Sequence, residues 1–236
     1  MALPKLNSMP KYTVTIPSLK EEVRIRPFVV KEEKILLIAM ESQDPKQIAG
    51  AILDTVVSCV EDPIDANKLT SYDVEYLFLQ IRGKSVGEKT NVSLKCQECD
   101  AETEVEIDIN DVKIDGEILP KQIKMTDDIS LEMRQPSYND IAADEMVVGQ
   151  GTNMDRIFAL IIQSINAVLT EDERIEFRSI PHKEAVEFIE SMTSEQFTQI
   201  REYMEKMPSL RHVAKWTCDG CGKPQELTLE GMQSFF

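Results

Sequence analysis

The sequence predicts an α+β protein: a helix-rich body with an N-terminal β-hairpin and a split zinc ribbon made of two CxxC knuckles. Three observations lead to this fold class. Apolar residues alternate with polar ones near the N-terminus, which is the period of a strand. Much of the following chain repeats its apolar residues at the spacing of one helix face. Two Cys-x-x-Cys motifs, at 96–99 and 218–221, each lie between two further strand-like segments.

The composition is that of a globular protein. The 236 residues are 42% hydrophobic and 29% charged, which is enough apolar material for a core. The net charge of −16 disfavours binding to nucleic-acid phosphates or to an anionic membrane surface. No apolar run reaches the roughly 18 residues of a membrane-spanning helix, and residues 1–13 lack a secretory signal. Five cysteines, an odd number, fit a reducing cytoplasm.

The first part of the chain is expected to form a hairpin. Residues 1–10 are interpreted as an arm, and residues 11–109 as a region with the β-hairpin, helices and the first ribbon knuckle. Strands are predicted at Tyr12–Ile16 and Glu22–Phe28, because apolar residues alternate in both. Pro17-Ser18 marks the turn between them.

Three helices are predicted after the hairpin. The first turns Ile35, Leu36 and Ala39 to one face. The second begins at Asp44-Pro45, because a capping Asp followed by proline is a favoured helix start. The third is apolar on more than one face, so we expect it to be the central helix. The predicted bounds are Lys31–Glu41, Asp44–Val60 and 71–82, with Gly83 or Gly87 ending the last.

The second half of the chain alternates between strand and helix patterns. Two strands over 91–109 would be joined at the first CxxC turn, and 110–136 would be a connecting β segment with a strand pattern from Ile123 to Met133. The predicted helical region, 137–210, has helices at 137–148, 155–168, 183–192 and 195–207. Thr193 and Gln196 form a capping box for the last helix. Residues 211–236 hold the second knuckle and the C-terminal tail.

The two CxxC motifs carry the strongest chemical signal. Thiolates two residues apart in a tight turn can face one Zn²⁺, and two such turns complete a tetrahedral site. Leu94 and Trp216 each precede the first cysteine by two positions, and apolar residues follow both motifs at matching positions. We therefore expect one structural Zn²⁺ per chain, bound by Cys96, Cys99, Cys218 and Cys221.

The spacing between the knuckles is unusual. The 118 residues from 100 to 217 separate them, where common ribbons have about 15–20. A helical unit would have to be inserted into the ribbon. Two alternatives stay open: a redox-active CxxC, and two thiol pairs without metal. Redox motifs usually begin a helix, whose dipole lowers the thiol pKa, whereas both motifs here lie between strand patterns.

No catalytic site is predicted. Four cysteines would fill the coordination of the zinc, whereas a catalytic zinc keeps one position for water. His212 could replace a ligand, but both it and His182 are interpreted as surface or capping residues. Cys59 lies on the apolar face of its helix and is interpreted as a small buried residue. The chain has no phosphate-binding glycine loop, no HExxH and no GxSxG.

Five segments are specific in combination. They are LPKLNSMPKYTVTIPS at 3–18, RPFVVKEEKILLIAMES at 26–42, TSYDVEYLFLQIRGKSVGE at 70–88, CQEC at 96–99 and SFF at 234–236. Together they resemble the baseplate hub protein family of T-even-like contractile-tailed phages. The resemblance covers most of the chain and is strongest in the first hundred residues.

The resemblance implies a non-enzymatic structural or assembly component of a phage tail baseplate hub. Its partners would be other baseplate, hub or tail-tube subunits, with no nucleic acid, membrane or small-molecule substrate. Its location would be the host cytoplasm during assembly, with the tail baseplate of the virion as a second location. The contact with partners is expected to be mainly apolar with an acidic rim, with Phe235 and Phe236 either as anchors or packed on the ribbon.

Two other function classes share the cysteines. A zinc-ribbon adaptor of transcription or translation machinery would normally add a basic face for nucleic acid. A thiol–disulfide enzyme would need reactive thiols without a bound metal. Zinc content distinguishes the enzyme from the other two classes, and salt-dependent binding to RNA or DNA would favour the adaptor.

Overall fold

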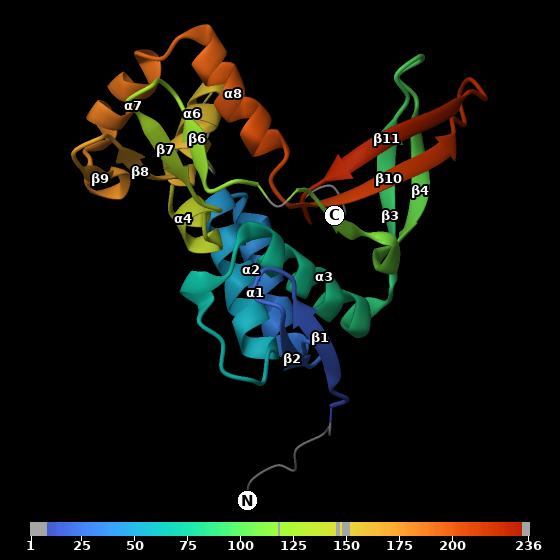
Figure 1. Ribbon diagram of the computed structural model, residues 1–236. Coiled ribbons are helices and arrows are strands. Elements are labelled where there is room, and N and C mark those ends of the chain that lie inside the picture. Colours follow the sequence, from blue (N-terminus) through green and yellow to red (C-terminus); the bar gives the residue numbers. More distant parts are fainter. Residues whose placement is uncertain (1–8, 118, 145–146, 148–151, 233–236) are drawn as a thin grey trace, which may run out of the picture. The chain divides into compact units, whose positions relative to one another are not determined.

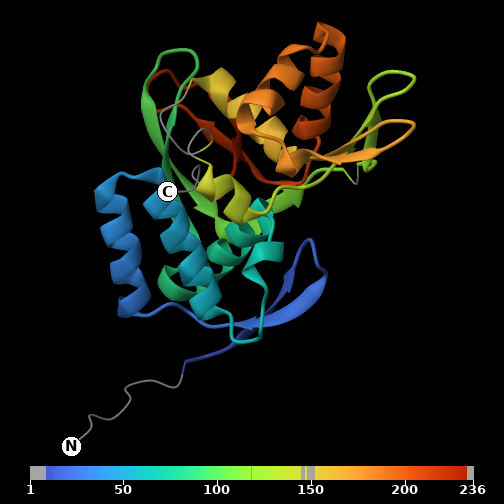
Figure 2. The same cartoon turned by 90° about the vertical axis from the view of Figure 1, so that its left-hand side faces the viewer.

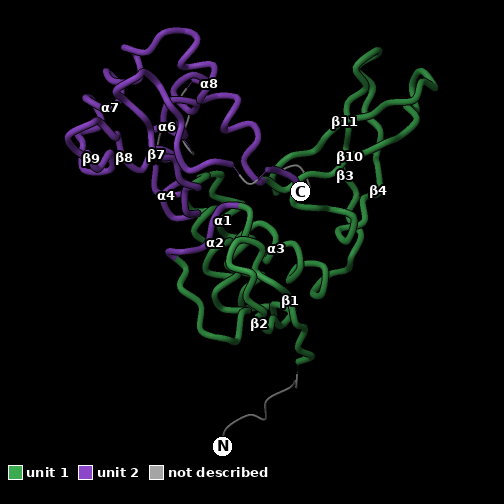
Figure 3. Tube along the Cα trace, in the orientation of Figure 1, with its two compact units in different colours: residues 1–66, 72–114, 209–236 green, residues 67–71, 115–208 purple. Residues whose placement is uncertain are grey.

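The computed structural model describes residues 9–117, 119–144, 147 and 152–232, and Figure 1 shows its helices and strands. These residues form two compact units, distinguished by colour in Figure 3. Unit 1 contains the chain up to residue 66, residues 72–114 and the chain from residue 209; unit 2 contains residues 67–71 and 115–208. The C-terminal segment therefore shares a unit with the first half of the chain, as a ribbon split between distant segments requires.

Unit 1 begins with the predicted antiparallel hairpin and three helices. In the hairpin, Val14 lies opposite Val23. The hairpin is tied to the end of the second helix, because the Arg26 N–H donates to the Cys59 carbonyl at 2.9 Å. The elements are β1 (Tyr12–Ile16), β2 (Glu21–Ile25), α1 (Val30–Ser42), α2 (Pro45–Cys59) and α3 (Ser71–Val86).

The starts of α1 and α2 are fixed by carboxylates. The predicted cap of α2 is confirmed, since Asp44 Oδ1 accepts the Lys46 N–H at 3.0 Å. At the start of α1, Glu32 is only 3% exposed. Its carboxylate accepts the Val29 N–H at 3.0 Å and pairs with the Arg26 guanidinium at 3.0 Å. A buried carboxylate with two donors is satisfied, so this contact holds α1 against the end of β2.

The third helix is the central helix of unit 1, as predicted. Val74, Leu77 and Ile81 are fully buried, and Phe78 and Leu79 nearly so. The apolar faces of α3 are thus covered within the chain rather than left for a partner.

The carboxyl of Glu75 in α3 is half-buried beside Met232. Glu75 Oε2 accepts the Met232 N–H at 3.2 Å. Burial raises the pKa of Glu75 from 4.5 to about 7, and the hydrogen bond from the Met232 N–H opposes this effect only in part. The folded carboxyl therefore holds its proton more tightly than the unfolded one.

Replacement of Glu75 by Gln should stabilise the protein at high pH. The contribution of Glu75 is fully present below pH 4.5 and is lost as the pH rises through about 7. Glu75→Gln keeps an acceptor for Met232 but carries no charge, so its free energy of unfolding at pH 8 should exceed that of the parent by up to about 3 kcal/mol. Thermal melts of both proteins at pH 4 and pH 8 test this. Equal stability at pH 8 would show that the carboxylate is solvated.

The rest of unit 1 is the ribbon, made of two hairpins that lie side by side in Figure 1. One hairpin pairs β3 with β4, and the other pairs β10 with β11 and adds β5 at the edge of β10. Leu94, Ile107 and Leu229 are buried between the hairpins and α3, in one core with Leu79. The strands are β3 (Lys89–Lys95), β4 (Glu102–Asp108), β5 (Lys113–Asp115), β10 (Ser209–Thr217) and β11 (Pro224–Glu230), with a 3-10 helix η2 (Ile109–Asp111) between β4 and β5.

Unit 2 combines a four-stranded antiparallel sheet, in the order β6-β7-β8-β9, with helices. Leu131 of the sheet, Ile161, Ile189 and Ile200 share its core. The predicted capping box is confirmed, because Thr193 and Gln196 bond reciprocally at 2.9 and 3.3 Å. The elements are β6 (Gln122–Lys124), β7 (Ser130–Met133), α4 (Tyr138–Ala143), α6 (Asn153–Ser164), β8 (Ile165–Leu169), β9 (Arg174–Glu176), the 3-10 helix η3 (Phe177–Ser179), α7 (His182–Glu190) and α8 (Ser194–Glu205).

The predicted helix at 155–168 is wrong in its last turn. α6 ends at Ser164, and residues 165–169 form β8, where Val168 lies opposite Leu131 of β7. Ile165 and Val168 are buried as predicted. A short, continuous apolar run fits a buried strand as well as a buried helix, and pairing with β7 decides between them.

Two further expectations differ from the structure or lie partly outside it. The helix predicted at 137–148 is shorter, since α4 ends at Ala143, and residues 145–146 and 148 are outside the described residues. The predicted arm up to residue 8 and the two C-terminal phenylalanines are outside them as well. In the part of the chain that is described, no helix has both the length and the apolar character of a bilayer-spanning segment.

Candidate metal centre

The two CxxC motifs form matching turns at the ends of the ribbon hairpins. In the first, the Cys96 N–H donates to Ala101 O at 2.9 Å, and the Asp100 N–H donates back to Cys96 O at 3.1 Å. In the second, the Cys218 N–H donates to Lys223 O at 3.0 Å, and the Gly222 N–H donates to Cys218 O at 2.9 Å. The residue after the second cysteine is left-handed in both turns, with φ of 57° at Asp100 and 70° at Gly222. Gly and Asp are residue types that tolerate this conformation.

The four thiols converge on one point. The Sγ atoms of Cys96 and Cys221 are 3.8 Å apart, and those of Cys99 and Cys218 are 3.6 Å apart. All four sulfurs lie within 4.8 Å of one another. Zn–S bonds of 2.3 Å at tetrahedral angles place sulfurs about 3.8 Å apart, whereas a disulfide needs about 2.05 Å. The geometry is that of four ligands around one ion.

In each turn, a backbone N–H donates a hydrogen bond to the sulfur of the first cysteine. The Glu98 N–H points to Cys96 Sγ at 3.4 Å, and the Gly220 N–H points to Cys218 Sγ at 3.3 Å. Cys96 and Cys218 are each 1% exposed, whereas Cys99 and Cys221 are exposed. Donors of this kind stabilise thiolates, the form that binds metal.

The pKa values of two of the thiols are shifted in opposite directions. The backbone N–H of Cys221 lowers the pKa of Cys218 to about 6, against the opposing effect of burial. The backbone N–H of Ala101 acts in the same direction on Cys99, but hydrogen bonding to Cys218, burial, and hydrogen bonding to Cys221 and Cys96 together outweigh it and raise the pKa of Cys99 to about 12. Metal binding would release the protons that these thiols still hold, because the thiolate is the form that binds metal.

Contacts between the two turns hold them in register. The Asp219 N–H donates to Thr103 Oγ1 at 3.1 Å, and Lys223 pairs with Glu98 at 2.6 Å. A Cβ added to Gly220 would lie 2.7 Å from Ala101 Cβ and 3.4 Å from Cys99 Sγ. Only glycine fits this position without a shift of one turn against the other.

The structure brings together all four predicted ligands and none of the other candidates. Within the described residues, the one cluster with metal-ligand geometry consists of Cys96, Cys99, Cys218 and Cys221. His212 lies in β10 opposite Leu229, and His182 begins α7. Sequence reasoning missed Gly220 and Thr103. The glycine inside the second CxxC was a visible signal of close approach, whereas the role of Thr103 depends on the pairing of the hairpins.

Cys59 is separate from the cluster and fully buried in α2. Burial raises the pKa of its thiol to about 11, as for a small apolar residue in a core. We predict that Cys59→Ala costs on the order of 1 kcal/mol of stability and leaves zinc content unchanged. Metal analysis of the purified variant tests this. Loss of metal would show that Cys59 is a ligand.

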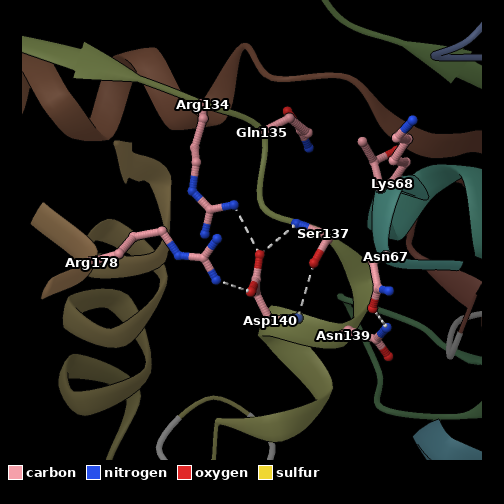
Figure 4. A pocket seen from close by; sticks show the side chains of 9 residues that line it. Asn67, Lys68, Arg134, Gln135, Ser137, Asn139, Asp140 and Arg178 are labelled. Carbon is pink, nitrogen blue, oxygen red and sulfur yellow. Dashed lines mark hydrogen bonds and ion pairs between the residues drawn. The ribbon is translucent and has the colours of Figure 1, made fainter. Parts of the chain in front are cut away.

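Unit 2 has a polar pocket of about 390 Å³, shown in Figure 4. At its centre, Asp140 accepts from Arg134 at 2.9 Å and Arg178 at 2.7 Å. Asp140 also accepts the N–H of Ser137, the capping residue of α4, at 3.2 Å. Burial opposes ionisation, but the bonds from Ser137 and Arg134 hold the pKa of Asp140 below its usual value. These bonds tie the chain just after β7 to α4 and η3, so the charged groups at the centre of the pocket are paired with one another.

Comparison with known proteins identifies the family. Residues 9–236 match the family described as T4 bacteriophage base plate protein. The chain belongs to this family. It is also 23% identical over 217 residues to the baseplate hub assembly protein gp26 of Enterobacteria phage T4, covering 91% of this chain and 92% of that protein. No solved structure matches the chain.

The family membership confirms the resemblance seen in the sequence. The chain is a phage baseplate protein with a structural or assembly role.

Proposed function

We propose that this baseplate protein is a non-enzymatic assembly component of the tail hub that acts in the host cytoplasm and binds other baseplate or tail-tube subunits. A structural Zn²⁺ at Cys96, Cys99, Cys218 and Cys221 would hold its ribbon together. The observation that carries the proposal is the convergence of these four thiols in a chain whose relative is named for hub assembly.

The metal would join two parts of the chain that are far apart in the sequence. Its ligands come from turns that are 118 residues apart in the sequence, so one ion closes a long loop that includes most of unit 2. Closing a long loop removes conformational entropy from the unfolded chain. The zinc would therefore hold the C-terminal hairpin on the first half of the chain.

The alternative as a nucleic-acid adaptor is disfavoured by charge. Residues 89–108, which form the β3–β4 hairpin and its knuckle, carry two lysines against six carboxylates. Binding to nucleic acid requires clustered cations that displace counterions from phosphates. A protein surface is the better partner for this hairpin.

The redox alternative is disfavoured by geometry. Each CxxC lies in a turn between strands, not at the start of a helix. The Sγ atoms of Cys96 and Cys221 are 3.8 Å apart and those of Cys99 and Cys218 are 3.6 Å apart, so each of these close pairs joins the two motifs. A redox pair would instead bring the two sulfurs of one motif into bonding range.

The function is tested by complementation of a phage that lacks this gene. We expect the parent chain and Cys59→Ala to restore infectious particles when supplied in trans. Cys218→Ser should fail, with tails that lack a complete hub. Purified parent chain mixed with the hub subunits of the same phage should co-elute with at least one of them in size-exclusion chromatography.

Two outcomes would contradict the proposal. One is normal hub assembly in the absence of the protein. The other is salt-dependent binding of RNA or DNA in a filter assay with no binding of hub subunits, which would favour the adaptor.

A further inference from the structure

The outer face of α1 is apolar and exposed. Figure 2 shows α1 at the edge of unit 1, with α2 beside it. Val30 is 77% exposed, and Leu37 and Ile38 are each 54% exposed. Ile35, which the sequence places inward beside Ala39, is 40% exposed at the edge of this face, whereas Ala39 is buried. Consecutive exposed apolar side chains of this size mark an interaction surface.

The charged residues on this face are placed so that they could pair with those of a second, antiparallel copy of the same face. Lys34, Leu37, Ile38 and Glu41 follow the spacing i, i+3, i+4, i+7 and therefore share one face. Among the described residues, neither Lys34 nor Glu41 has an ion-pair partner. The lysine lies toward the N-terminal end of α1 and the glutamate toward its C-terminal end.

We propose that α1 is the contact surface for a second copy of this chain, which binds it as an antiparallel helix pair. A twofold axis between Leu37 and Ile38 places Leu37 of one copy on Ile38 of the other. The same axis places Lys34 opposite Glu41 of the second copy, and the reciprocal pair follows by symmetry. One helix face thus supplies both the apolar centre and two flanking ion pairs.

The helix dipoles support the antiparallel arrangement. The positive Lys31 and Lys34 lie in the first turns of α1, where the macrodipole of their own helix disfavours cations. Antiparallel pairing moves both lysines beside the negative C-terminal end of the other helix. The buried pair between Arg26 and Glu32 holds α1 on unit 1, so the face is presented without local unfolding.

The size of the surface sets the expected affinity. α1 has 13 residues, so it is about 20 Å long. Two such helices bury less than about 1,200 Å², the range of weak and transient contacts. We therefore expect a concentration-dependent dimer with a dissociation constant in the micromolar range.

The test is sedimentation velocity of the full chain over a wide range of concentration, with charge-reversal variants. Lys34→Glu and Glu41→Lys should each weaken dimerisation about tenfold, because each turns two attractive pairs into repulsive ones. The double variant should dimerise like the parent. An equal mixture of the two single variants should form heterodimers, since opposite charges then face each other again.

Controls separate the contact from folding and from function. Lys206→Glu makes the same charge change at the end of α8 in unit 2 and should leave dimerisation unchanged. Circular dichroism of each variant establishes that it is folded. Three results would overturn the proposal: a parent chain that stays monomeric at every concentration, a dimer insensitive to both single variants, or a mixture that does not restore association. Binding of hub subunits is measured separately, so failure of the dimer does not imply failure of the proposed function.

Discussion

Cys96→Ser and Cys218→Ser should each abolish stoichiometric zinc binding and lower the thermal stability of the protein to the same extent. The reason is that each variant removes one sulfur from the same four-sulfur cluster. Structural zinc contributes roughly 10 kcal/mol or more in small domains, so the expected loss exceeds that of any ordinary core substitution in this chain. Metal analysis and thermal melts of both variants provide the measurement.

The matched control for these variants is Cys59→Ala, which also removes a thiol but from the interior of α2. Unit 2 has its own apolar core, so the ribbon variants should keep part of their helical signal in circular dichroism. If Cys96→Ser lost the metal while Cys218→Ser retained it, the two knuckles would not share one ion.

Gly220→Ala should have the second largest effect, because it forces the two knuckles apart. The new Cβ would lie 2.7 Å from Ala101 Cβ, a contact that neither side chain can relieve by rotation. Overpacking of this kind costs about 1–3 kcal/mol. Zinc affinity should fall with it, because Cys99 Sγ is only 3.4 Å from the same position.

A second substitution makes this prediction specific. The double variant Ala101→Gly and Gly220→Ala removes the clash and should recover most of the zinc affinity. Gly222→Ala serves as the comparison, because its strain comes from a φ of 70° and no atom lies within 4 Å of its added Cβ. Competition for zinc with a chromophoric chelator measures all three. Equal affinity in Gly220→Ala and the parent would show that the turns are not in close contact.

The parts of the fold that could be predicted from sequence are those with strong local signals. α2 and α8 begin at side-chain caps that can be read directly, at Asp44 and Thr193. The matched flanks of the two CxxC motifs predicted that distant hairpins would meet, and the four thiols are indeed together. In each case, the residues that determine the local structure lie close together in the sequence.

The parts that could not be predicted depend on distant partners. Residues 165–169 continue the apolar pattern of α6 but pair with β7, which lies outside any local window. β9 was missed because its three residues are all exposed. Ile35 is 40% exposed because the buried face of α1 is centred on Glu32 and Ala39 and leaves Ile35 at its edge, and periodicity cannot show that a charged side chain will be buried.

The central claim is that the two CxxC turns share one zinc ion. The measurement that tests it most directly is native mass spectrometry of the full chain, combined with X-ray absorption at the zinc edge. The account predicts one zinc per chain, surrounded by four sulfurs at about 2.3 Å. A folded chain that carries no zinc after purification without chelator, or a zinc with nitrogen or oxygen among its ligands, would contradict it.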